Sequence, residues 1–218
     1  MIPNEISTFS TTSEHRLGRV ATSALSVLAF SIVVTAFSAA FASPSEPERF
    51  VRELTDKALA ILQDNSLASE TKAQRLDNEL GDCCDFATTA KLVLARNWKE
   101  FNPDQQHEFV GLFRTYLVAT YRKNIDTYSG EVVEIVGGRE ENRGDYTVKT
   151  RFVKSGQNEV LVDYRLRKGS TDRWLIIDII PEGISLVSNL RSQFQEIFSK
   201  DGVKGVLGTM RKKIAESA

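Results

Sequence analysis

The sequence predicts an α+β domain in which helices pack on a twisted antiparallel sheet of about four to five strands. Apolar residues recur at helical spacing from residue 45 to residue 120 and again from residue 187 to residue 214. Between these regions, from residue 131 to residue 167, they alternate with polar residues. Helices on both sides of one strand cluster indicate segregated helices and strands rather than alternating β-α-β units.

The first 42 residues have the features of an export signal. His15, Arg16 and Arg19 precede an uncharged apolar run, and Ala40-Phe41-Ala42 supplies the small-x-small pattern of a signal peptidase site. We predict a signal peptide over 1–42, cleavage after Ala42, and a single domain over 43–218 in the periplasm. The alternative is an uncleaved anchor, because the uncharged run is long enough to span a bilayer.

Charge and cysteine content exclude several classes of function. A formal net charge of −1 gives no electrostatic attraction to nucleic acid or to an anionic membrane surface. The only cysteines, Cys83 and Cys84, are neighbours and cannot staple distant parts of the fold. With His107 as the one histidine after the export segment, no zinc site of the usual spacing is present.

Four helices are expected in the first half. Ser45-Glu-Pro-Glu48 predicts a capped helix start, and a second helix is expected from Ser69 to Leu80 and a third from Asp85 through Trp98. Asn102-Pro-Asp-Gln105 predicts the start of the fourth. Its apolar stripe consists of Phe109, Leu112, Phe113, Tyr116, Leu117 and Thr120.

Strands are expected next. Val133 and Ile135 alternate with Glu134, and Gly137-Gly138 is expected to open a connection. On either side of a Ser155-Gly156 turn, two strands place on one face Tyr146, Val148, Thr150, Phe152, Val160, Val162, Tyr164 and Leu166. The uniformly apolar run from Trp174 to Ile180 predicts a central strand, covered on both faces.

The chain then returns to helix along two apolar stripes, with glycines at 202, 205 and 208 that we attribute to close helix packing. No catalytic constellation accompanies these elements. Gly183-Ile-Ser-Leu-Val187 lacks the second glycine of a nucleophile elbow, and Asp178 is expected to satisfy backbone groups at a strand end. The sequence therefore predicts a binding protein with no catalytic residues, no metal and no cofactor.

Several segments, in this order and spacing, resemble the MlaC-type periplasmic phospholipid-binding proteins, also called toluene-tolerance auxiliary transport proteins. These are Leu92–Trp98, Pro103–Gln106, Phe109–Tyr121, Tyr128–Glu131, Trp174–Asp178, Glu182–Leu186 and Arg191–Phe194. The resemblance spans nearly the whole of residues 43–218. Ala95 stands where the family often has glycine, and the Cys83-Cys84 pair is not part of the family pattern.

The resemblance implies a carrier that encloses phospholipid acyl chains in an apolar cavity between helices and sheet. It also implies that the protein transfers lipid between an outer-membrane lipoprotein complex and an inner-membrane ABC transporter complex. This transfer would be a role in outer-membrane lipid asymmetry. A hopanoid-associated lipid is the nearest variant of the cargo. Two other classes stay open: a non-catalytic envelope interaction protein with a solid core, and an enzyme on a similar cone of sheet and helices.

For the cavity, the stripe of the fourth helix is expected to face the inner side of the sheet across an apolar space. The predicted lipid-binding residues are Phe109, Phe113, Tyr116, Leu117, Val148, Phe152, Val162, Tyr164, Leu166, Trp174 and Ile176. Candidate docking groups for partner complexes are the cationic side chains of Arg165, Arg167, Lys168 and Arg191.

Overall fold

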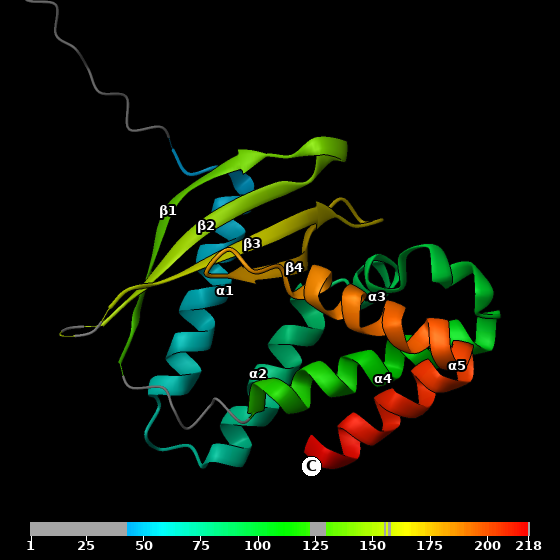
Figure 1. The fold of residues 1–218 in the computed structure, drawn as a ribbon. Helices are drawn as coiled ribbons and strands as arrows, with labels where there is room; N and C mark the ends of the chain where they lie inside the picture. The colour runs from blue at the N-terminus through cyan, green and yellow to red at the C-terminus, as the bar shows by residue number, and fades with distance from the viewer. Residues whose placement is uncertain (1–42, 123–129, 155, 157, 218) are drawn as a thin grey trace, which may run out of the picture. The chain divides into compact units, whose positions relative to one another are not determined.

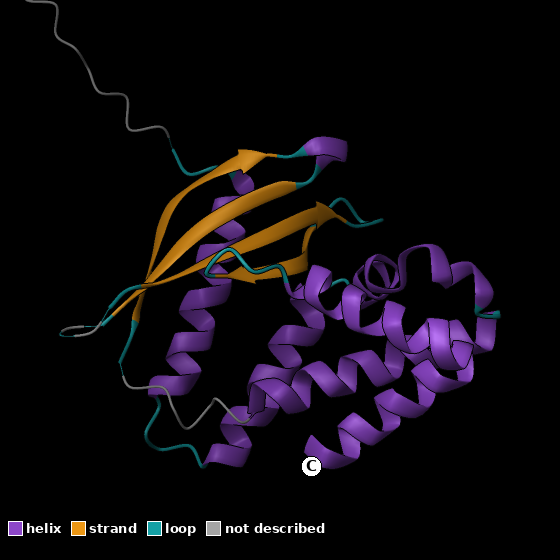
Figure 2. Cartoon of the chain, viewed as in Figure 1, coloured by secondary structure: helices purple, strands orange, loops and turns teal. Residues whose placement is uncertain are grey.

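A computed structural model describes residues 43–122, 130–154, 156 and 158–217. The predicted export segment (1–42) and Ser155 of the predicted turn lie outside the described residues. The elements run in the order α1 (Glu46–Gln63), α2 (Ser69–Cys83), α3 (Phe86–Leu94), 3-10 helix η1 (Ala95–Glu100), α4 (Pro103–Arg122), β1 (Val132–Glu140), 3-10 helix η3 (Asn142–Gly144), β2 (Tyr146–Val153), β3 (Val160–Lys168), β4 (Trp174–Pro181) and α5 (Leu186–Ser217) (Figure 1). Helices therefore precede and follow one strand cluster, which confirms the predicted α+β class (Figure 2).

Reciprocal hydrogen bonds confirm two of the predicted helix starts. At α1, the Ser45 backbone N–H donates to the Glu48 carboxylate (2.7 Å) and the Glu48 N–H donates to the Ser45 hydroxyl (3.4 Å). At α4, the Asn102 N–H donates to the Gln105 side chain (3.0 Å) and the Gln105 N–H donates to the Asn102 side chain (2.9 Å). Each pair satisfies backbone donors that the first helical turn leaves without partners.

The third helix is shorter than predicted. α3 ends at Leu94 because Ala95 adopts a φ of 48°, and the chain continues as the 3-10 helix η1, which contains Trp98. A residue with a side chain rarely adopts this left-handed conformation. This conformation gives a physical reason for the glycine that the resemblance associates with the position of Ala95.

The sheet is a meander of four antiparallel strands in the order β1-β2-β3-β4. β1 is longer than predicted, since Gly137 and Gly138 lie inside it rather than in a connection. The pairing shifts by one residue between Ile135 and Gly137, where Gly137 has a φ of 135°. A Cβ on Gly138 would lie 2.4 Å from the Tyr146 ring. The strand is therefore continuous, with a bulge at Val136 beside Gly137, and Gly138 leaves room for the Tyr146 ring.

β4 is an edge strand, so the prediction that it is central was wrong. Its edge is covered by the junction of α2 and α3. Cys84 forms a parallel bridge with Ile176, the Asp85 N–H donates to the Ile176 carbonyl (3.0 Å), and the Thr89 hydroxyl donates to the Ile177 carbonyl (3.2 Å). Because helices cover this edge, an apolar sequence fits an edge strand here as readily as it fits a central strand.

α5 joins the two predicted C-terminal helices through a change of direction at Gly202, which has φ 59° and ψ −155°. The attribution of the glycines to close packing was wrong for Gly202 and Gly208, because a Cβ at either position would meet nothing within 4 Å. The predicted role of Asp178 is confirmed. Its carboxylate accepts from the Val187 N–H (3.0 Å) and the Ser185 hydroxyl (2.6 Å) at the start of α5.

Buried apolar side chains form two separate clusters. The helical cluster lies among α3, α4 and α5 and consists of Ala90, Val93, Leu94, Phe101, Phe109, Phe113, Val187, Leu190, Phe194, Val206, Leu207 and Met210. The sheet cluster lies between α1 and one face of the sheet and consists of Val51, Cys83, Val148, Tyr164, Leu166 and Ile176. We call this face of the sheet the inner face.

Candidate functional site

The structure places the four predicted residues of α4 in the helical cluster, away from the sheet cluster. Phe109 and Phe113 are 0% exposed, and the Phe109 ring stacks on Phe113 (centroids 5.9 Å apart) and meets Phe194 of α5 edge-on at 5.6 Å. Tyr116 and Leu117 are half-buried and pack against the same cluster. The expectation that this stripe faces the sheet was therefore wrong, because the stripe packs against α3 and α5 instead.

The seven predicted residues of the sheet share the inner face, as their cross-strand register shows. Val148, Tyr164, Leu166 and Ile176 are buried in the sheet cluster, with Val162 and Trp174 packed partly buried against it, and Phe152 is half-buried. The structure thus brings together the sheet part of the predicted site but not its helical part.

Burial of the inner face is greatest at Val148 and Leu166 and falls toward the β2–β3 connection. Leu166 and Val148 are 0% exposed beneath α1, Val162 is half-buried, and Val160 at the start of β3 is 45% exposed. Phe152 pairs with Val160 on one side and with Val133 on the other, forming a half-covered apolar row. The inner face is therefore closed beneath the start of α1 and open near the β2–β3 connection.

Sequence reasoning missed the part of this site that comes from α1 and β1. Phe50 and Leu54 of α1 and Ile135 of β1 pack partly buried against the sheet cluster, and α1 lies against β1 and β2 (Figure 1). Farther along α1, Ala58 and Ile61 are also half-buried. The alternation in β1 and the stripe of α1 were both visible in the sequence, but neither pattern specifies which surfaces meet.

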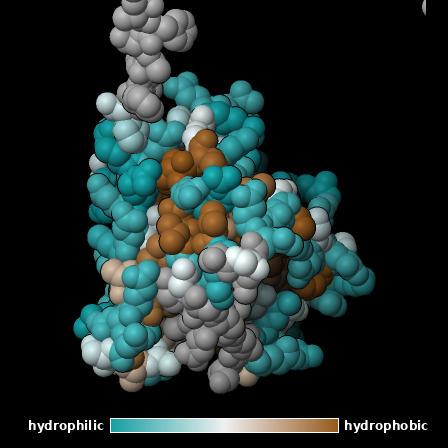
Figure 3. All heavy atoms as spheres, turned by 90° about the vertical axis from the view of Figure 1, so that its left-hand side faces the viewer, coloured by the Kyte–Doolittle hydropathy of each residue, from teal (hydrophilic) through white to brown (hydrophobic). Residues whose placement is uncertain are grey.

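The surface near the open end is apolar between two hydrophilic flanks, on the side of the domain where β1 lies (Figure 3). Not every exposed apolar side chain near this end lies on the inner face. Val132 (57% exposed) and Leu161 (45%) pair with Val153 and Arg151 and so point to the opposite face, whereas Val160 belongs to the inner face. An exposed apolar patch is uncommon in soluble domains unless it serves binding.

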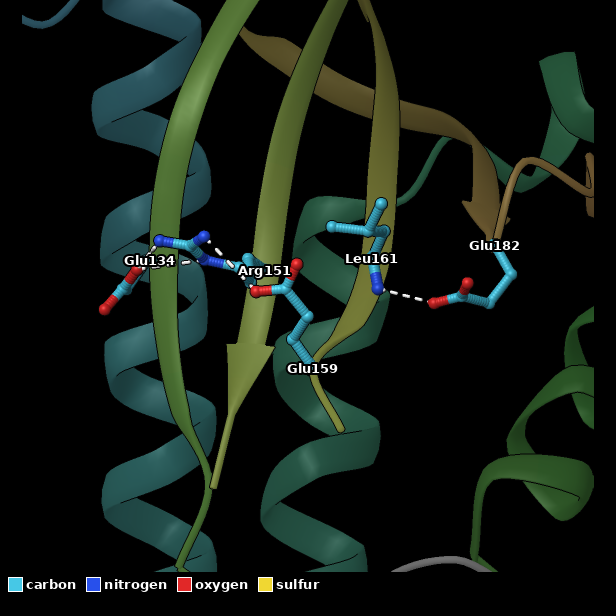
Figure 4. Close-up of polar contacts among 5 residues, drawn as sticks. All are labelled: Glu134, Arg151, Glu159, Leu161 and Glu182. Atoms are coloured by element: carbon cyan, nitrogen blue, oxygen red, sulfur yellow. Dashed lines mark hydrogen bonds and ion pairs between the residues drawn. The ribbon is translucent and has the colours of Figure 1, made fainter. Parts of the chain in front are cut away.

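Polar contacts on the opposite, outer face hold the strands together at this open end (Figure 4). Arg151 of β2 contacts Glu134 of β1 at 2.6 Å and Glu159 at 3.2 Å. The Leu161 N–H donates to the Glu182 carboxylate (2.6 Å), while the Glu182 N–H donates to the Leu161 carbonyl (2.9 Å). These contacts link β1, β2, β3 and the turn after β4. They hold the strands together at the open end, where apolar packing on the inner face is incomplete.

Described residues also line two hollows on the surface. One, of about 490 Å³, lies between η1 and α5 and is lined mainly by polar side chains such as Arg96, Asn97 and Ser192. The other, of about 360 Å³, lies between α1, α2 and the β3–β4 turn; it has a rim of charged side chains and includes Trp174 of the predicted site.

Three of the four predicted docking groups have partners within the chain. Arg167 forms a bidentate pair with Asp145 (2.6 and 2.8 Å), Lys168 contacts Asp172 (3.1 Å), and Arg191 donates to the Leu92 carbonyl (2.8 Å). The hydrogen bond to Asp145 raises the pKa of Arg167. Of these four, Arg165 has a buried Nε with no hydrogen-bond partner.

Within the described ranges, no group of three or more His, Cys, Asp or Glu side chains is placed to hold a metal ion. His107 is exposed at the start of the second turn of α4. In the same part of the chain, no helix combines the length and apolarity needed to cross a bilayer.

Comparison with known proteins agrees with this architecture. The phospholipid-binding protein from Ralstonia solanacearum, whose structure was solved in complex with a phospholipid, superposes with a TM-score of 0.71 at 23% sequence identity. The alignment covers 79% of this chain and 99% of that one, and this likeness shows the fold. The family model described as MlaC protein matches residues 52–212, from the first turns of α1 to the last turns of α5. The chain therefore belongs to the MlaC family.

Proposed function

We propose that this chain binds a phospholipid, with its acyl chains in the cleft between α1 and the inner face of the sheet. The observation that carries the proposal is the half-covered apolar row at the open end of that face, where Val160 is 45% exposed. Family membership supports the same cargo, as does the likeness to a protein solved with a bound phospholipid.

The cleft would be lined at its open end by side chains that the domain leaves partly uncovered. These are Val133, Ile135, Phe152, Val160 and Val162 of the sheet, opposite Leu54 and Ala58 of α1. Val148, Tyr164, Leu166, Trp174 and Ile176 would form its closed end. Phe109 and Phe113 are not part of this proposal, because other helices already bury them fully.

Transport follows from the energetics of acyl chains. Exposing two acyl chains to water costs on the order of 20 kcal/mol at ~0.8 kcal/mol per methylene, so a lipid crosses an aqueous space only inside an apolar container. Moving the chains from bilayer to cleft exchanges one apolar medium for another and is nearly neutral. Direction must then come from partners.

We propose that, after removal of residues 1–42, the protein works in the periplasm as a non-catalytic carrier. It would exchange lipid with an outer-membrane lipoprotein complex and an inner-membrane ABC transporter complex. Weak, reversible docking suits a carrier that must release its cargo, so we expect small interfaces.

Native mass spectrometry and lipid extraction of freshly purified protein test the binding step. The expected result is a diacyl phospholipid in stoichiometric amount. A triterpenoid would redirect the proposal to a hopanoid-type cargo, and an apo mass with no extractable lipid would contradict it. An N-terminus at Met1 in periplasmic protein would refute the cleavage.

A further inference from the structure

The last residue of α2, Cys83, and its neighbour Cys84 bring two thiols together at the edge of the sheet cluster. Their Sγ atoms lie 3.6 Å apart, and neither forms a disulfide. Adjacent residues meet in this way only when both side chains turn to the same side of the chain. Nothing in the proposed binding of lipid uses the pair.

Cys83 is buried, at 5% exposed, but it lies next to a surface hollow. Cys83 borders the hollow of about 360 Å³ between α1, α2 and the β3–β4 turn, together with Phe50 and Trp174. Charged side chains, among them Arg49 and Asp172, also line this hollow. Cys84 is itself half-buried rather than fully buried. A small water-soluble disulfide therefore has a route to Cys83, whose sulfur lies 3.6 Å from that of Cys84.

We propose that Cys83 and Cys84 form a modification site, at which an external low-molecular-weight or protein disulfide oxidises the pair to a disulfide between adjacent residues. One cysteine, as its thiolate, attacks a sulfur of the external disulfide, forming a mixed disulfide and releasing one thiol. The other cysteine then attacks the protein sulfur, closes the ring and releases the second thiol. The two cysteines lose two protons and two electrons, and the external disulfide becomes two thiols.

The geometry makes this bond labile rather than structural. Adjacent Cα atoms lie ~3.8 Å apart across a trans peptide, below the ~4.4–6.8 Å of ordinary disulfides, so ring closure strains the backbone and favours reduction. The pKa of the Cys84 thiol is raised well above its usual value, chiefly by its hydrogen bond with Cys83 and also by burial. Thiolate is then scarce at neutral pH, and exchange is slow.

Oxidation would shift the backbone at the closed end of the proposed cleft. The backbone of Cys84 bridges to Ile176, and the next N–H, of Asp85, donates to the Ile176 carbonyl at 3.0 Å. Ring closure must rotate the bonds between residues 83 and 84, which sit directly beside this contact. An effect on lipid retention rests on the proposed function, whereas formation of the disulfide does not.

The test is intact-mass analysis of the purified protein after prolonged incubation with oxidised glutathione, followed by alkylation with N-ethylmaleimide. We expect the wild type to lose two hydrogen atoms, to take up no maleimide, and to recover both thiols with dithiothreitol. Matched variants Cys83→Ser and Cys84→Ser should stop at a single glutathione adduct, because neither can close the ring.

A wild-type chain that keeps both thiols, retains glutathione or forms covalent dimers overturns the proposal. Mass is measured under denaturing conditions, after any lipid has dissociated. The result is therefore independent of whether the chain carries a phospholipid, and the two proposals can fail separately.

Discussion

Replacing Val162 with tryptophan tests whether the open end of the inner face is a binding cleft or incomplete core. Val162 is half-buried and lies between the closed end of the sheet and the exposed Val160. An indole there should occupy space that an acyl chain would otherwise fill. If it displaces about three methylenes, lipid affinity falls by about 2.4 kcal/mol, roughly 50-fold in Kd.

Leu166→Trp provides the matched control, on the same strand and the same face. Leu166 is 0% exposed and packs in the sheet cluster. An indole there has no open space to enter, so overpacking should cost ~1–3 kcal/mol of folding stability. For a domain of this size that loss lowers Tm by roughly 2–4 °C per kcal/mol.

The assay pairs quantitative lipid extraction with thermal unfolding of delipidated protein. Val162→Trp should lose lipid while the Tm of the empty protein changes little, and Leu166→Trp should lower the Tm. If Val162→Trp instead loses stability in step with lipid, then Val162 belongs to the core. If it retains full lipid, the cleft lies elsewhere.

Three further predictions concern stability, each measured by urea denaturation. Asp178→Ala removes the carboxylate that accepts two hydrogen bonds at the start of α5 and should cost about 3 kcal/mol; a loss below about 1 would show that solvent replaces it. Gly202→Ala should cost ~1–3 kcal/mol, because φ 59° with ψ −155° is essentially restricted to glycine, whereas Gly208→Ala on the regular part of α5 should be neutral or stabilising. Arg167→Ala should cost about 2 kcal/mol by leaving the Asp145 carboxylate, 10% exposed, without its bidentate partner, and an unchanged midpoint would contradict this.

Local chemistry could be predicted well from the sequence. The capped starts of α1 and α4 follow from side chains that reach only three residues along the chain, as at Ser45 and Glu48. The alternation in β2 and β3 predicted which side chains share the inner face, and the structure adds the register, for example Val148 opposite Tyr164. Such features depend on neighbours in sequence or on adjacent antiparallel strands.

Features that depend on distant partners were predicted less well. The apolar run of β4 indicated burial, but burial by the α2–α3 junction at an edge leaves the same pattern as burial in the middle of a sheet. Gly137 and Gly138 indicated a break, yet glycine also occurs inside a strand, beside a bulge or where a ring packs on the backbone. The end of α3 at Ala95 could not be foreseen from its residue type, since alanine favours a helix.

The position of the α4 stripe explains why the inner face of the sheet is only partly covered. Had Phe109 and Phe113 packed on the sheet, their rings would have covered the inner face and left an ordinary core. Instead they are fully buried by α3, α5 and their own neighbours, so these two rings are not available to cover the sheet. The inner face is then covered mainly by α1, which buries Val148 and Leu166 but leaves Val160 exposed. Separate packing of the helices thus leaves part of this apolar face uncovered, at the place where we propose that a lipid binds.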